Sequence, residues 1–146
     1  GNKSVNQLRK CIDLGILENN FNLPTAANTS VNYNDASQPL EKRVRSYIDI
    51  NCGHCHRTGG HCDYVDLRLN YSNTDLNTFG VCMTPLFSIP NGPYVINGGN
   101  ADQSEMIQRI SSTEESLMMP YIGRTLVHEE GVELIRSWIN TLPECR

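Results

Sequence analysis

Five consecutive residues, Cys52-Gly53-His54-Cys55-His56, constrain this chain more than any other part of its sequence. Two thiols three residues apart on a helical turn can both reach one ligand, and C-x-x-C-H is the pattern through which c-type haem is attached. The thiols would add to the two vinyl groups of the haem, and the adjacent imidazole would lie below the porphyrin plane, where it can bind iron. We therefore predict one covalent haem c on Cys52 and Cys55, with His56 as an axial iron ligand.

Two other kinds of site also use a close pair of cysteines. A thioredoxin-like redox pair expects a βαβ context, which the sequence does not show, and a zinc site expects a second close pair of ligands. The remaining cysteines are scattered along the chain, at Cys11, Cys62, Cys82 and Cys145. The missing βαβ context speaks against the redox pair, and the scatter of the other cysteines speaks against zinc, so haem attachment is favoured over both alternatives.

A second axial ligand is expected later in the chain, at Met118-Met119-Pro120. Pro120 disfavours helix at the preceding residue and stiffens the turn, which would hold a thioether towards iron. Methionine opposite histidine raises the reduction potential and suits electron transfer. We expect Met119 as this ligand; Met118, His61, His128, an open iron site, or methionines that only fill the core are the alternatives.

Apolar residues at helical spacing predict short helices separated by polar segments. Between residues 57 and 102 this periodicity vanishes, and so long a loop inside a compact domain usually needs a reason, such as a ligand to wrap. The expected helices run from Ser4 to Leu17, from a Ser37 cap into Cys52, from a Ser104 cap onward, and from about His128 to Leu142.

The chain has 146 residues, the size of one domain, which we divide into an N-terminal helix and polar extension over 1–36 and a haem-binding core over 37–146. Only 38% of its residues are hydrophobic, so a bound apolar group would help to complete the core. The net charge of −4 argues against nucleic acid or an anionic membrane as the main partner. No apolar run approaches a membrane span and no signal peptide is visible, so we expect a monomeric module of a larger exported chain.

Several stretches resemble the monohaem class I cytochrome c family, and more narrowly the haem modules of exported bacterial multidomain proteins, some of which are linked to polysaccharide oxidation. The resemblance implies an all-α cytochrome c fold, with short helices around one covalent haem and a long irregular loop that wraps it. It also implies Cys52 and Cys55 as attachment sites, His56 as the proximal ligand and Met119 as the distal ligand. The matching stretches are 43–57, 66–68, 98–110, 119–123 and 131–139.

These features predict a single-electron carrier rather than an enzyme, located in the periplasm or outside a bacterial cell. The alternative is a haem enzyme or a gas or peroxide sensor with an open distal site. The redox partner would be an extracytoplasmic oxidoreductase. The resemblance makes a copper-dependent lytic polysaccharide monooxygenase or a quinone-dependent sugar dehydrogenase the candidates.

Other residues have secondary roles in this hypothesis. Arg68, Arg109 and Arg124 are candidates to pair with a haem propionate, because a guanidinium matches a carboxylate with a forked pair of hydrogen bonds. Tyr47, Tyr121 and Trp138 are candidates to pack on the haem or donate to a propionate, although core packing explains them as well. Of the three pairings open to the four spare cysteines, we favour Cys62 with Cys82 and Cys11 with Cys145.

Overall fold

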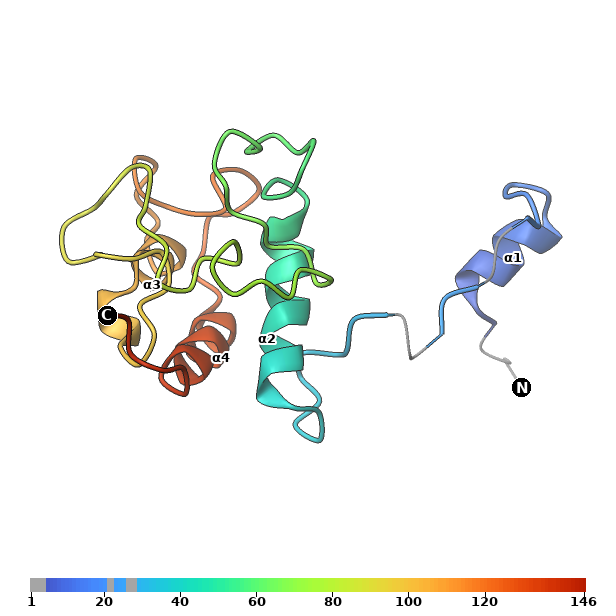
Figure 1. The fold of residues 1–146 in the computed structure, drawn as a ribbon. Helices are drawn as coiled ribbons and strands as arrows, with labels where there is room; N and C mark the ends of the chain where they lie inside the picture. Colours follow the sequence, from blue (N-terminus) through green and yellow to red (C-terminus); the bar gives the residue numbers. More distant parts are fainter. Residues whose placement is uncertain (1–4, 21–22, 26–28) are drawn as a thin grey trace.

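The computed structural model describes residues 5–20, 23–25 and 29–146. These residues contain four α-helices, a π-helical turn and a 3-10 turn (Figure 1). They contain no β-strand, only isolated bridges between Val81 and Ile96 and between Tyr94 and Ser104. In chain order the elements are α1 (Gln7–Asp13), α2 (Leu40–Ile48), η1 (Asp49–Gly53), η2 (Ala101–Gln103), α3 (Glu105–Ile110) and α4 (Glu129–Ile139).

The expectation of an all-α cytochrome c fold is wrong: the described chain is mostly irregular. Its α-helices have only seven, nine, six and eleven residues. The segment between η1 and η2 is rich in glycine, asparagine and proline, and its backbone groups are satisfied by turns and by side chains. Asn73, for example, donates through Nδ2 to the Arg68 carbonyl at 2.7 Å and accepts through Oδ1 from the Asp75 N–H at 3.0 Å. Such local bonds replace helical ones, as is typical of asparagine and aspartate.

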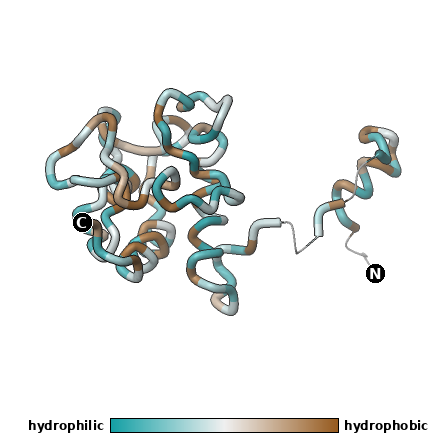
Figure 2. The backbone as a smooth tube through the Cα atoms, viewed as in Figure 1, coloured by the Kyte–Doolittle hydropathy of each residue, from teal (hydrophilic) through white to brown (hydrophobic). Residues whose placement is uncertain are grey.

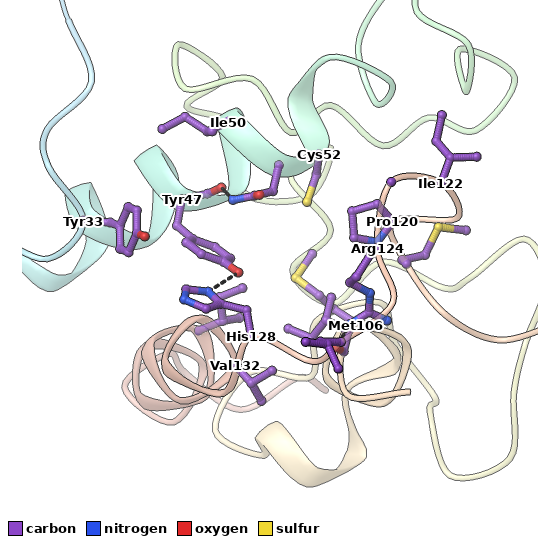
Figure 3. A pocket seen from close by; sticks show the side chains of 16 residues that line it. Tyr33, Tyr47, Ile50, Cys52, Met106, Pro120, Ile122, Arg124, His128 and Val132 are labelled. Atoms are coloured by element: carbon purple, nitrogen blue, oxygen red, sulfur yellow. Dashed lines mark hydrogen bonds between the residues drawn. The ribbon is translucent and has the colours of Figure 1, made fainter. Parts of the chain in front are cut away.

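Helix α2 forms where the sequence predicts it and carries the attachment motif at its end. Val44 and Ile48 are fully buried on one face. Ser37 does not cap the helix, because its hydroxyl donates to Asp35 Oδ1 at 2.7 Å instead. The helix continues without a break into η1, whose wider π turn holds one more residue per turn than an α-helix would. This turn places Cys52 on the side of the helix that faces α3 and α4 (Figure 3).

The core is built by α2 packed against α4, with α3 and η2 against α4 as well. Loop residues complete it, because Phe79 and Ile96 are fully buried and Phe79 lies edge-on to Trp138, with ring centroids 6.1 Å apart. Five of the fourteen buried hydrophobic residues of the described chain therefore come from irregular segments, namely Leu67, Leu69, Phe79, Val81 and Ile96. None of the helices in the described ranges is long and apolar enough to cross a membrane.

Helix α1 is separate from this core. It begins after Asn6, whose side chain accepts hydrogen bonds from the N–H groups of Leu8 and Arg9. The helix carries hydrophobic residues (Figure 2), yet it buries none of them and packs against no other helix of the described chain. It is shorter than expected, and Ser4, its expected start, lies outside the described residues.

The disulfide differs from both pairings that we favoured. Cys82 bonds to Cys145, with their Cα atoms 5.4 Å apart, while Cys11 and Cys62 are free. The C-terminal residues are brought to this loop by long-range contacts such as the hydrogen bond from the Gly98 N–H to Cys145 Sγ at 3.2 Å. Cys11 lies on α1, away from the core, and so does not meet Cys145.

Candidate haem site

The attachment motif forms one tight helical turn. The Cys52 carbonyl accepts hydrogen bonds from the N–H groups of Cys55 at 3.1 Å and His56 at 3.0 Å. Residues three and four positions apart on such a turn share one side, so the motif groups two thiols and an imidazole. Gly53 packs closely here: a Cβ would lie 3.0 Å from Asp49 Oδ1 and 3.1 Å from the Leu69 carbonyl oxygen, so a larger residue would need these neighbours to shift.

A cavity of about 330 Å³ opens beside this turn. Figure 3 shows that the sulfur of Cys52 is directed towards it. Its walls come from α2 and η1, from the start and end of α3, from the segment after Met119, and from α4. The lining residues are Tyr33, Tyr47, Ile50, Asn51, Cys52, Met106, Ile110, Met119, Pro120, Ile122, Gly123, Arg124, Leu126, His128, Val132 and Ile135.

Both cysteines of the motif are free, and so is Cys62 nearby. Burial, and to a smaller extent the neighbouring Cys55, raises the pKa of the Cys52 thiol to about 12. The same two causes raise the pKa of Cys62. Cys52 therefore keeps its proton at neutral pH and is present as a thiol, the form that adds its S–H across a vinyl group.

His56, the last residue of the attachment motif, is half-buried. Its buried Nδ1 has no hydrogen-bond partner among the described residues. Burial lowers its pKa, and the nearby His54 and Arg68 lower it further. The imidazole is therefore held neutral, which is the form that binds a metal. Neither His56 nor Cys55 lines the cavity; of the motif, only Cys52 does so.

Met119 lines the cavity together with Cys52, whereas Met118 does not. Its N–H donates to the Arg109 carbonyl at 3.0 Å, and a cis peptide bond joins it to Pro120. The structure thus brings one predicted attachment cysteine and the predicted distal methionine, 67 positions apart (119 − 52) in the sequence, to one cavity. Of the alternatives, His61 is exposed and His128 lines the cavity.

The predicted arginines are engaged by the protein itself. Arg68 pairs with Asp63 at 2.9 Å and with Asp66 at 3.5 Å, and it does not line the cavity. Arg109 pairs with Glu105 at 2.6 Å and also lies outside the lining.

The other predicted side chains are divided between surface and core, apart from Tyr47 and Arg124, which line the cavity. Tyr121 is 66% exposed, while Trp138 is 3% exposed within the core, and neither lines the cavity. Arg124 does line it, and its buried Nε has no partner among the described residues.

Two of the candidate residues, Tyr47 and His128, line the cavity as a hydrogen-bonded pair, which the sequence did not predict. The Tyr47 hydroxyl lies 2.9 Å from His128 Nδ1, with the two rings stacked and Tyr33 edge-on to both (Figure 3). Gly131 makes room for the pair, because a Cβ there would lie 2.2 Å from the Tyr47 hydroxyl and 2.7 Å from His128 Nδ1. The one signal in the sequence was this glycine inside a helical pattern, a position where glycine often marks a close approach.

These residues fit a haem group in their chemistry. The motif offers free thiols and a neutral imidazole, and the cavity adds a thioether. Ile50, Ile122 and Leu126 line the cavity although each is more than half exposed, so a bound apolar group would remove them from water. The volume lies at the lower end of the range for small-molecule sites.

The alternatives to haem gain less support. Within the part of the chain that the structure describes, no three His, Cys, Asp or Glu side chains gather into a group that could hold a metal ion. A zinc site needs such a group, whereas a haem iron needs at most two protein ligands.

No family model, curated protein or solved structure matches this chain.

Proposed function

We propose that this chain carries one covalently attached haem c and transfers single electrons. The observation that supports this most directly is the C-x-x-C-H turn with both thiols free and Cys52 facing a cavity that Met119 also lines. A redox-active cysteine pair would need neither a methionine in the cavity lining nor an apolar rim around the cavity.

The residues divide the work in this proposal. Cys52 and Cys55 would hold the haem through thioethers, so that the cofactor would stay on the chain when its oxidation state changes. His56 and Met119 would be the residues that bind its iron, and with both bound no iron position would remain for a substrate. The haem itself supplies a one-electron couple, and methionine opposite histidine raises its potential.

The partner in this proposal is another exported oxidoreductase, with a copper-dependent lytic polysaccharide monooxygenase or a quinone-dependent sugar dehydrogenase as candidates. The Cys82–Cys145 disulfide supports an oxidising compartment outside the cytoplasm. The net charge of −4 favours a basic docking surface on the partner. Higher salt should therefore slow electron transfer between the two, and a salt-independent rate would contradict electrostatic docking.

One observation favours a second function, a haem enzyme or sensor with an open site. The Tyr47–His128 pair supplies a hydroxyl and an imidazole on the cavity wall, and distal polar groups decide whether a haem binds or activates small ligands. This function requires Met119 to be absent from the iron.

The test begins with production of the full chain in a bacterial periplasm that has the machinery for haem c attachment. Mass spectrometry of the denatured protein should show the added mass of one haem, and replacement of both Cys52 and Cys55 by alanine should abolish it. Replacement of Cys11 and Cys62 by alanine is the matched control and should leave attachment intact. Absence of covalent haem from the wild type would refute the proposed function.

Spectra then separate the two functions. The oxidised wild type should show the weak far-red sulfur-to-iron band, and Met119→Ala should lose it while Met118→Ala keeps it. A wild type that is high-spin and shifts on addition of cyanide or carbon monoxide would exclude the electron carrier and leave the enzyme or sensor.

A further inference from the structure

The segment that holds Met119 has little structure of its own. Residues 111–128 lie between α3 and α4 and form turns and bends. Its internal bonds are local, with the N–H groups of Leu117 and Met118 both donating to the Glu114 carbonyl at 2.9 and 2.8 Å. The position of Met119 at the cavity therefore depends on contacts between this segment and the rest of the protein.

Arg109, in the last turn of α3, supplies two of these contacts. Its Nη1 donates to the Leu117 carbonyl at 3.2 Å, and its own carbonyl accepts from the Met119 N–H at 3.0 Å. One residue thus binds the chain on both sides of Met118. This fixes the direction in which the chain enters Met119.

The guanidinium of Arg109 is itself fixed in place. Its Nε donates to Glu105 Oε1 at 2.6 Å, and its Nη2 donates to the Phe87 carbonyl at 3.1 Å. Glu105 is buried, and Gly92 lies against it so closely that a Cβ there would be 3.1 Å from Glu105 Cβ. These bonds hold the guanidinium in place, and because Glu105 is buried, loss of Arg109 would leave its charge without this ion-pair partner.

Arg124, five residues after Met119, binds the end of the same helix through its side chain. Its Nη1 donates to the Ile110 carbonyl at 2.5 Å and its Nη2 to the Ser112 carbonyl. Carbonyls at the C-terminus of a helix lack partners within the helix, so these bonds satisfy groups that would otherwise be open. Met119 thus lies in the sequence between Arg109, in the last turn of α3, and Arg124, which binds carbonyls at and just after the end of that helix.

We infer that Arg109 is a positioning residue that holds Met119 at the cavity. The inference rests on the proposed function, because it treats Met119 as the axial ligand. In this role Arg109 does not contact the cofactor. Its guanidinium binds the Leu117 carbonyl, and its backbone carbonyl accepts the hydrogen bond from the Met119 N–H. Lysine would keep the charge beside Glu105, but a single ammonium does not reproduce the fork that reaches Glu105, Leu117 and Phe87 at once.

The test compares Arg109→Gln and Arg109→Lys with a matched control, Arg45→Gln. Arg45 also pairs with a glutamate four residues before it, Glu41 at 2.8 Å, and also donates to a distant carbonyl, that of Asn73 at 2.6 Å. It does not contact the segment of Met119. The control therefore removes a similar set of bonds without moving the ligand.

Arg109→Gln should keep its covalent haem, lose most of the sulfur-to-iron band and have a lower reduction potential. Arg109→Lys should be intermediate, and Arg45→Gln should match the wild type in both measurements. In the haem-free full chain, amide hydrogen exchange at Met119 should be about five- to tenfold faster in Arg109→Gln than in Arg45→Gln, which is the effect of one hydrogen bond.

A band and potential in Arg109→Gln equal to those of Arg45→Gln would overturn the inference while the proposed function stands. If the wild type carries no haem, the proposed function fails, and equal Met119 exchange in the two haem-free variants would overturn the positioning role separately. If Arg109→Gln does not fold, Glu105→Gln serves instead, because it keeps the volume and one acceptor while removing the charge that orients Arg109. Glu105→Gln should weaken the sulfur-to-iron band without abolishing it. An unchanged band in this variant would overturn the inference.

Discussion

Two regions of this molecule hold cysteines in pairs, and the structure treats them differently. Cys82 and Cys145 are 63 positions apart in the sequence, and they are joined in a disulfide between a loop and the C-terminus. Cys52 and Cys55 share one turn and remain free, and Cys52 lines a cavity. Sequence distance therefore does not decide which cysteines pair. The first pair closes the fold, and the second stays available for chemistry.

The largest expected effect comes from the pair that closes the fold. Replacement of both Cys82 and Cys145 by serine should lower the free energy of unfolding by about 4 kcal/mol, because a cross-link over this distance restricts the unfolded chain. Urea unfolding measures the change. The matched replacement of Cys11 and Cys62 should cost less than about 1 kcal/mol. Equal losses would show that the loss does not come from the cross-link between Cys82 and Cys145.

The next effect compares the two sides of the helix that carries the motif. Ile48 is fully buried in the core, whereas Ile50, two residues later, is 59% exposed at the cavity rim. Ile48→Ala should cost about 3 kcal/mol, and Ile50→Ala less than about 0.5 kcal/mol in the haem-free protein. Urea unfolding again gives both values. A large loss at Ile50 would mean that the rim is packed in the absence of a ligand.

A smaller effect is expected at Gly131, which packs against the cavity-lining residues Tyr47 and His128. A methyl group there would overlap the end of Tyr47, and we expect Gly131→Ala to cost about 2 kcal/mol despite the better helix propensity of alanine. Thermal or urea unfolding provides the measurement, with Ser137→Ala on the exposed face of α4 as the control. Combining Gly131→Ala with Tyr47→Leu should cost less than the sum of the two. If the two stability losses simply add, the methyl group at position 131 does not contact Tyr47.

The smallest effect concerns pH and the free thiol at the cavity. The pKa of Cys52 is raised from 9.0 to about 12, so the fold favours the protonated form. This contribution is complete below pH 9 and is lost as the pH rises towards 12, because the unfolded chain releases the proton first. Between pH 8 and 10 the haem-free protein should lose about 1 kcal/mol of stability, measured by urea unfolding. Cys52→Ser should lose less than wild type and Cys11→Ser as much; the same loss in all three would assign it to other groups.

The sequence located most of the helices because apolar spacing is a local signal. The helix expected from about His128 to Leu142 is observed as Glu129–Ile139, and the one expected from Ser104 as Glu105–Ile110. The sequence also singled out Met119 through the neighbouring Pro120, and the structure places Met119 with Cys52 on one cavity; its binding to iron stays a prediction. The attachment of haem stays a prediction.

The global arrangement did not follow, because it depends on contacts between distant residues. The segment after the motif is ordered by bonds such as Val95 N–H to the Met83 carbonyl at 2.8 Å, which leave no periodicity in the sequence. The Tyr47–His128 pair joins residues 81 positions apart, and the disulfide depends on where the C-terminus returns. A resemblance in short stretches predicted the site, but it could not predict how these irregular segments fold.

The disulfide also divides the two proposed iron ligands between different parts of the covalent structure. Met119 lies within the closed ring from Cys82 to Cys145, and His56 lies on the open chain before it. A protease that cuts once between 83 and 144 leaves both fragments joined through sulfur, so a non-reducing gel shows an intact mass. A single cut between 57 and 81 releases a fragment with His56 from one with Met119. Partial digestion can therefore separate the attachment half of the site from its methionine half without any substitution.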